Sequence, residues 1–216
     1  FYRSADVLIV DDVQFLAGKE KIDEPFKALF NQGMLHDKDG MVMSKSSGNV
    51  VLPEEVSKKY GIDSARLFLI SIASPDKDVQ WSEKGIEGSF RFIKKVFEYF
   101  DKIQIKSGKS KQKVSAIVES KLNKTIKEIA EDIENFKYNI AIIKIRELFE
   151  LIMKENITNK EVLSKMLKLI SPFCPHIAEE FWHKIGNKTL ISLETWPKFD
   201  ESKIDEKLEQ LEKTVD

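Results

Sequence analysis

A serine-rich loop holds the residues of this 216-residue chain that are best suited to chemistry. Lys45 lies between Ser44 and Ser46 in the stretch MVMSKSSGNVV at 41–51, and Ser47 follows. A lysine on a loop of small residues can bring its ammonium to a phosphate, while hydroxyls and free backbone amides donate further hydrogen bonds. Such a loop stabilises charge that develops on a triphosphate under attack, without supplying a nucleophile. Plain solvent loops share this composition, so the residues alone leave both interpretations open.

Local signals on both sides of the loop predict the elements that must position it. Residues 33–43 predict a β-hairpin with Asp39-Gly40 at its turn. Pro53 is expected to start a helix that Gly61 ends. The loop therefore joins a hairpin to the N-terminus of a helix.

Two more helices are predicted after this one. Residues 63–73 form the first, with Asp63 as its N-cap, and an amphipathic helix runs from Ser82 to about Ile103. Its apolar stripe is expected to contain Phe90, Ile93, Val96, Phe97 and Phe100. Upstream of the hairpin, residues 5–12 predict a buried strand and residues 23–31 a short helix.

The second half of the chain has a purely helical pattern. A basic, Gly/Ser-containing linker at 106–113 precedes it. Apolar residues then recur at helical spacing over 117–133, 142–152 and 163–170, and a fourth helix is expected at 176–185. Four amphipathic helices in succession predict an antiparallel bundle.

Composition and charge exclude several classes of protein. Hydrophobic residues make up 42% of the chain, which argues against disorder. With 35 basic and 36 acidic residues the net charge is -1, so nucleic-acid binding would have to come from local patches. The single cysteine, Cys174, excludes an internal disulfide and favours a reducing compartment. No apolar run reaches the ~18 residues of a membrane span and no signal peptide is visible, so we expect a cytoplasmic protein without membrane contact.

The loop and its neighbours resemble one enzyme family in order along the chain. Residues 42–46 align with the "KMSKS" signature of class I aminoacyl-tRNA synthetases, and Gly48-Asn49 match the turn that follows it. The flanking segments resemble leucyl-tRNA synthetases: IDEPFKALFNQGM at 22–34, YGIDSARLFLI at 60–70, PDKDVQWSEKGIEG at 75–88, ISPFCPHIAEEFW at 170–182 and LETWPKFD at 193–200. The resemblance covers about 22–210, and it favours the leucyl enzymes over the valyl and isoleucyl enzymes of the same architecture.

The resemblance implies roles for the loop residues. Lys45 takes the position of the signature lysine that contacts ATP phosphates during amino-acid activation, and is the implied catalytic residue. Met43, Ser44 and Ser46 occupy the supporting ATP-binding positions. Val42 replaces the first lysine of the signature, so any contact from that position is lost or comes from elsewhere.

The resemblance also implies a mostly α fold, in which the end of a Rossmann-like α/β catalytic domain precedes a helical anticodon-binding bundle. The expected divisions are a segment of uncertain origin at 1–21, the end of the catalytic domain at 22–105, the linker, and the anticodon-binding domain at 114–216. The implied reaction is ATP-dependent ligation of leucine to tRNA, with Mg²⁺-ATP as co-substrate and no protein-bound metal.

The chain lacks a "HIGH"-type motif, because none of its three histidines has that context. We therefore expect a fragment or subunit that is inactive alone, whose missing catalytic half is either carried by a separate chain or lost by truncation. A non-catalytic tRNA-binding or assembly module is an alternative from a different class, and a valyl- or isoleucyl-type fragment is another.

Residues 1–20, FYRSADVLIVDDVQFLAGKE, resemble instead the Walker B strand of bacterial replication-initiator ATPases of the AAA+ class. Asp11 and Asp12 would be the acidic pair that holds Mg²⁺ and polarises water. No phosphate-binding G-x-x-x-x-G-K-[ST] loop exists in the chain. We favour a strand that takes the place of the last parallel strand before the loop over a working ATPase site.

Two side-chain groups outside the loop have alternative interpretations. Lys121, Lys124 and Lys127 belong to a lysine-rich stretch that can bind tRNA phosphates or simply form a solvated helix face. Cys174 and His176, with a second histidine two turns on, have metal-ligand chemistry but no evident fourth ligand for zinc. Core packing at a helix start is the favoured interpretation of that group.

Overall fold

The computed structural model describes residues 30–103 and 112–208. The chain divides into two units, Phe1–Asn31 and Gln32–Asp216, and the elements below all lie in the second. The predicted strand at 5–12, the predicted helix at 23–31 except for its last two residues, and the acidic pair at 11–12 lie outside the described residues. Most of the basic linker does too.

Two short parallel strands form the base of the loop. Strand β1 (Leu35–His36) pairs with β2 (Val79–Gln80), with Leu35 opposite Val79. The predicted turn is present, with Gly40 at φ 81°. The predicted hairpin is reduced to one antiparallel bridge, between His36 and Val42. Strand β1 pairs with β2 instead, and the Asp37 carboxylate accepts from the turn amides that a ladder would use.

Two helices follow the loop directly. Helix α1 (Pro53–Tyr60) begins and ends where the sequence predicts, with proline in its first turn and Gly61 at φ 80° just after it. Helix α2 (Ile62–Ser71) starts immediately, so Gly61 serves both helices. The expected cap is wrong: Gly61 holds the N-cap position, and Asp63 lies within the first turn with its side chain buried and bonded to another element.

Helix α3 (Glu83–Lys102) confirms the predicted amphipathic helix, and Ser82 caps it by accepting from the Gly85 amide at 3.2 Å. The predicted stripe is partly wrong. Phe90 and Phe97 are 38% and 50% exposed, whereas Phe92 is buried. Two overlapping stripes of aromatic residues run along this helix, and the core selects the one through Phe92 and Phe100.

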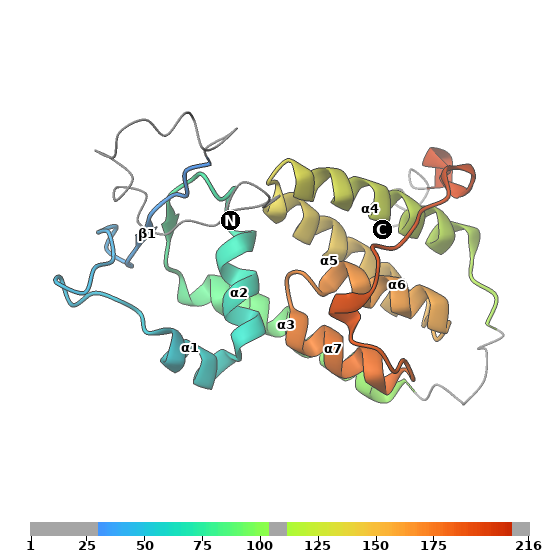
Figure 1. Cartoon of the computed structure of the whole chain (residues 1–216), viewed down its shortest axis with the longest axis horizontal. Helices are drawn as coiled ribbons and strands as arrows, with labels where there is room; N and C mark the ends of the chain where they lie inside the picture. Colours follow the sequence, from blue (N-terminus) through green and yellow to red (C-terminus); the bar gives the residue numbers. More distant parts are fainter. Residues whose placement is uncertain (1–29, 104–111, 209–216) are drawn as a thin grey trace, which may run out of the picture. The chain divides into compact units, whose positions relative to one another are not determined.

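The remaining helices form the predicted bundle (Figure 1). They are α4 (Ala116–Glu134), α5 (Tyr138–Lys154), α6 (Lys160–Ile170) and α7 (Pro175–Lys184). Ser115 and Asn159 cap α4 and α6. Short 3₁₀ turns at Ile191–Leu193 and Glu201–Lys203 follow α7.

Two separate apolar clusters organise these helices. The large one takes buried residues from α2 to α7, including Phe100, Phe149 and Phe181. The small one contains Val56, Tyr60, Ala65, Phe68 and Ile86, with Val51 and Trp81 packed against it. Helix α2 contributes to both, because Leu67 belongs to the large cluster and Phe68 to the small one. The loop-bearing segment is thereby packed on its own small core.

Candidate functional site

The Asn49 side chain closes the serine-rich loop. Its Oδ1 accepts a hydrogen bond from the Ser44 amide at 2.9 Å. Its Nδ2 donates to Asp37 Oδ2 at 2.7 Å and to the Val42 carbonyl at 3.2 Å. One side chain thus ties the start of the loop, its end and the preceding turn together.

The other oxygen of Asp37 holds the turn. Asp37 Oδ1 accepts from the amides of Asp39 and Met41, both at 2.9 Å. The hydrogen bond from Asn49, followed by that from the Met41 amide, lowers the pKa of Asp37 below its ordinary value. The carboxylate therefore stays ionised and keeps all its donors at neutral pH.

A histidine–aspartate pair fastens the turn to the second strand. His36 Nδ1 lies 2.8 Å from the Gly40 carbonyl oxygen, and its Nε2 lies 3.3 Å from Asp78 Oδ2. The Met34 amide donates to the other oxygen of Asp78 at 2.8 Å. The Gly40 carbonyl, and after it Asp78, raises the pKa of His36, while the Met34 amide and the His36 charge lower the pKa of Asp78.

Lys45 is at the solvent-exposed part of this framework. Its carbonyl accepts from the Gly48 amide at 3.3 Å, and Gly48 adopts φ 67°, which closes a tight turn under the lysine. Among the described residues, no hydrogen bond or ion pair engages its ammonium. The backbone is fixed while the side chain is free to meet a ligand.

Met43, Ser44 and Ser46, the supporting positions of the loop, make contacts within the chain, whereas the Lys45 ammonium makes none among the described residues. The Met43 amide donates to the Leu35 carbonyl at 2.9 Å, which ties the loop entry to β1. Ser44 Oγ donates to Ser47 Oγ at 2.7 Å, accepts from the Ser47 amide at 3.2 Å and lies 3.2 Å from Ser46 Oγ. The hydroxyls are bonded to each other, so binding a phosphate would require them to exchange partners.

The sequence interpretation located the lysine but missed its supports. Asn49 was matched only as a turn residue, and Asp37, His36 and Asp78 were not singled out. Asp78 is 42 positions beyond His36 in the chain, so no local pattern joins them. The available signal was the crowding of polar side chains around two very short strands.

The three lysines considered for tRNA binding all lie on α4 and each has a carboxylate partner. Lys121 pairs with Glu147 at 3.0 Å, and Lys127 pairs with Glu201 at 2.7 Å. Lys124 lies 4.0 Å from Glu128 on the same helix. Their charges are compensated locally, so phosphates would have to compete with these acids.

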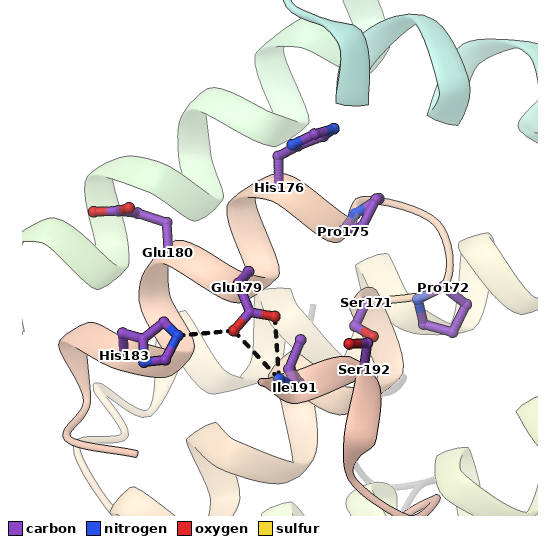
Figure 2. Close-up of a pocket in the computed structure, with 9 residues that line it drawn as sticks. All are labelled: Ser171, Pro172, Pro175, His176, Glu179, Glu180, His183, Ile191 and Ser192. Atoms are coloured by element: carbon purple, nitrogen blue, oxygen red, sulfur yellow. Dashed lines mark hydrogen bonds and ion pairs between the residues drawn. The ribbon is translucent and has the colours of Figure 1, made fainter. Parts of the chain in front are cut away.

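The group considered for metal binding does not come together. Cys174 is buried, and that burial raises the pKa of its thiol. His183 Nε2 instead lies 2.9 Å from Glu179, which also accepts from the Ile191 amide at 3.1 Å (Figure 2). In the described ranges no cluster of three or more histidine, cysteine or carboxylate side chains could hold a metal.

Glu179 and His183 belong to the lining of a hollow of about 570 Å³ beside the start of α7. Figure 2 shows its lining residues on α7, on the turn before it and at the 3₁₀ segment that carries Ile191. The two side chains are already paired with each other and with backbone, so neither is free to bind a ligand in the hollow without exchanging partners. Of the helices within the described residues, none is long and apolar enough to cross a bilayer.

Two family models match the chain. Residues 115–216 match the "Anticodon-binding domain of tRNA ligase", and residues 10–82 match "tRNA synthetases class I (I, L, M and V)". The second match begins inside the stretch 1–20 that resembles replication ATPases, so residues 10–20 also fit a synthetase pattern.

Curated relatives carry the name leucine–tRNA ligase. The chain is 40% identical to the Thermosipho melanesiensis protein over 91% of its own length, and 42% identical to the Fervidobacterium nodosum protein over 85%. These matches cover 26% and 24% of the relatives. The chain spans about a quarter of the length of the proteins it matches.

Solved structures agree with this assignment. The LeuRS of Agrobacterium radiobacter K84, in a ternary complex with tRNA and LeuAMS, superposes with a TM-score of 0.73 at 27% identity, over 85% of this chain and 25% of that one. Methionyl-tRNA synthetase of Mycobacterium tuberculosis has the same fold, with a TM-score of 0.57 at 17% identity, over 74% of this chain and 38% of that one. The chain belongs to the leucyl-tRNA synthetases of class I and carries the loop segment of their catalytic domain together with the anticodon-binding bundle.

Proposed function

We propose that this chain supplies the ATP loop and the tRNA-binding bundle of a leucine–tRNA ligase. The whole enzyme would activate leucine with Mg²⁺-ATP and transfer it to tRNA(Leu). The observation that supports this most directly is the exposed Lys45 ammonium on a loop whose backbone is closed by Asn49. Residues 22–105 would complete the catalytic domain, and residues 114–216 would hold the RNA.

The chemistry of activation explains why a lysine is wanted here. The leucine carboxylate attacks the α-phosphorus of ATP and pyrophosphate leaves, so negative charge grows on the phosphate oxygens as the reaction proceeds. Lys45 would stabilise that charge as a compact ammonium with three donors. Ser44 and Ser46 would add hydroxyl donors after exchanging their mutual hydrogen bonds, and Met43 would keep the loop entry on β1.

The remaining catalytic surface would come from elsewhere, because the HIGH-type motif is absent from this sequence. The first experiment therefore adds the purified chain to a Thermosipho melanesiensis ligase that lacks the region matched by this chain. Leucine-dependent ATP–pyrophosphate exchange should appear only in the mixture. Robust exchange by the chain alone, or none in the mixture despite tRNA binding, would contradict the proposal; the second result favours a non-catalytic tRNA-binding module.

The second experiment tests Lys45 within that mixture. Lys45→Ala should lower the exchange rate by about 10²–10³-fold, the usual loss for removing one charge-stabilising donor. The leucine KM should change little, because the lysine faces phosphate rather than the amino acid. Lys38→Ala is the matched control, since Lys38 is also exposed but lies on the turn that precedes the loop. Equal activities of both variants would refute the role of Lys45.

A third experiment tests the proposed tRNA contacts of α4. Reversing charge at Lys121, Lys124 and Lys127 should weaken binding of a leucine tRNA transcript and reduce the salt dependence of the affinity. Reversal at Lys84, Lys94 and Lys95 on α3 changes the net charge by the same amount and is the control. Unchanged affinity and salt slope would assign these lysines to the helix surface alone.

A further inference from the structure

The buried carboxylate of Asp63 binds a helix that begins more than a hundred residues later in the chain. It is 6% exposed and stands in the first turn of α2. Its Oδ2 accepts from the Ile177 amide at 2.8 Å, and its Oδ1 lies 3.5 Å from the His176 amide. Both amides belong to the first turn of α7.

These two amides are the ones that an N-cap side chain normally satisfies. The local residue at that position, Cys174, makes no side-chain cap hydrogen bond, and Pro175 has no amide hydrogen. The carboxylate also meets the positive end of the α7 dipole. Asp63 therefore serves as the N-cap of α7, although it lies on α2.

The position of α2 makes this contact more than a local cap. Helix α2 contributes Phe68 to the small core that carries α1 and the loop exit, and Leu67 to the large core of the bundle. The loop reaches α2 through Val51, which packs against the small core, and then through α1. A displacement of α7 would therefore reach the segment that holds Lys45 through α2 and α1.

Helix α3 also runs from one core to the other, with Ile86 in the small cluster and Val96 in the large one. It also makes polar contacts at both ends: Glu83 accepts from the Tyr60 hydroxyl at 2.9 Å, and the Tyr99 hydroxyl donates to the Ile157 carbonyl at 2.7 Å. The short hydrogen bond from the Ile177 amide, with the longer contact from the neighbouring His176 amide, fixes the register and direction of α7 against α2. Asp63 is the directional connection that α2 makes between the two packed regions, and it adds to the contacts of α3.

We propose that Asp63 is the positioning residue that couples the helical bundle to the loop carrying Lys45, so that RNA seated on the bundle alters the order of the loop. This inference rests on the proposed function for its RNA ligand, although the coupling itself is testable without RNA. The residue acts through α2 and α1, and it is not itself placed against a substrate.

The RNA-free test follows hydrogen exchange along the whole chain at increasing urea concentration. In the wild type, α1–α2 and α7 should lose protection at one shared midpoint. Asp63→Ala should increase exchange at residues 176–178 by about tenfold or more, as expected for losing a hydrogen bond to a charged group. It should also open α1–α2 at lower urea than α4–α6. A cap that stabilises α7 alone would leave α1–α2 unchanged, and that result would overturn the proposal.

The chain provides a matched control and a conservative variant. Ser64 is the neighbouring buried residue, and its hydroxyl has no hydrogen-bond partner among the residues that the structure describes. Ser64→Ala should keep the shared midpoint. Asp63→Asn keeps an acceptor oxygen and should fall between the wild type and Asp63→Ala. If Asp63→Ala does not fold, Asp63→Asn provides the test. The coupling is overturned if α1–α2 and α7 lose protection in Asp63→Asn at one shared urea midpoint, as they do in Ser64→Ala.

The RNA arm adds a saturating leucine tRNA transcript. In the wild type and in Ser64→Ala, the RNA should slow exchange both on the bundle and at residues 44–56. In Asp63→Ala it should slow exchange on the bundle only. Equal protection of the loop by tRNA in all variants would refute the coupling. A wild-type chain that binds no tRNA would refute the proposed function, and the role of Asp63 would then be tested by the urea experiment alone.

Discussion

The loop region and the helical bundle are held together by different forces. The bundle buries a large continuous set of aliphatic and aromatic side chains across α3 to α7. The loop region has a small apolar cluster and depends on named polar contacts of Asn49, Asp37, His36 and Asp78. Apolar burial is non-directional and robust, whereas a hydrogen-bond network fixes a geometry but fails when one member is lost.

This difference suits the two proposed tasks. A surface that holds a large RNA needs a stiff scaffold, and close-packed helices provide it. A loop that follows phosphates through a reaction needs a defined backbone with an unrestrained side chain, as Lys45 has. The substitutions below test whether the two regions respond as differently as their contacts predict.

The largest effect is expected in the core of the bundle. Phe149 is fully buried and lies against Phe92, Tyr99 and Phe100, with ring centroids 5.8, 5.6 and 6.5 Å away. Phe149→Ala should lower the free energy of unfolding by about 3–5 kcal/mol, through lost burial and the cavity left behind. Chemical denaturation followed by circular dichroism measures this loss.

The control for Phe149 lies on the same helix. Ile143 is 51% exposed, so Ile143→Ala should change the free energy of unfolding by no more than about 0.5 kcal/mol. Similar losses in the two variants would mean that the large cluster does not carry the stability of the bundle.

A smaller and more local effect is expected at Gly33. A Cβ at this position would lie 2.0 Å from the Lys77 carbonyl oxygen, which is backbone and cannot move aside alone. Gly33→Ala should therefore separate β1 from β2 at a cost of about 1–3 kcal/mol, confined to the loop base. Hydrogen exchange should rise at 33–43 and 77–81 and stay unchanged in α4–α6.

Gly88 is the glycine control, because a Cβ at this position would lie 3.9 Å from a nitrogen of the flexible Arg91 side chain, an ordinary contact distance. Gly88→Ala lies within α3 and should stabilise the helix by about 1 kcal/mol. If Gly33→Ala destabilised the bundle as much as the loop base, the two regions would be one cooperative unit.

The sequence predicted those features that depend on neighbours along the chain. Pro53 and Gly61 mark the ends of α1 by their own backbone preferences, and helical spacing of apolar residues revealed the bundle. The choice between Phe90 and Phe92 on α3 was wrong, since both stripes are apolar and only tertiary packing selects one.

The contacts that organise the site escaped prediction for a related reason. Asp63 has the sequence signature of a cap for its own helix, yet burial brings it to α7, 114 positions before its partner Ile177. The bond from Asn49 to Asp37 spans twelve positions across a loop. A side chain with two possible partners binds the one that the fold brings close to it. A single sequence does not specify which residues the fold brings together.

Asn49→Ala tests whether one side chain closes the loop. It removes three hydrogen bonds around Ser44, Val42 and Asp37, and should loosen the loop by about 1–2 kcal/mol. Trypsin cleavage after Lys45 should become about tenfold faster, because cleavage follows the population of the open loop. Asn135→Ala removes a comparable amide–carbonyl contact on α4 and should leave that rate unchanged. An equal effect of the two variants would remove Asn49 from the framework.

The smallest effect is a pH dependence confined to the loop base. The folded state raises the pKa of His36 above its ordinary 6.5, so this histidine stabilises the base fully below pH 6.5. The contribution is lost as pH rises through the raised pKa. Asp37 and Asp78 have lowered pKa values, so their contributions are present above their ordinary 3.8 and are lost as pH falls through the folded-state values.

All three groups are therefore charged and paired between pH 3.8 and 6.5, and the loop base should be tightest there. Hydrogen exchange at 36–43, corrected for the intrinsic pH dependence of the amides, should rise slightly from pH 6 to 8 in the wild type. His36→Gln keeps a polar side chain without the titration and should give a flat profile over that range. Identical profiles would show that the His36–Asp78 pair is passive, and the loop would then depend on Asn49 and Asp37 alone.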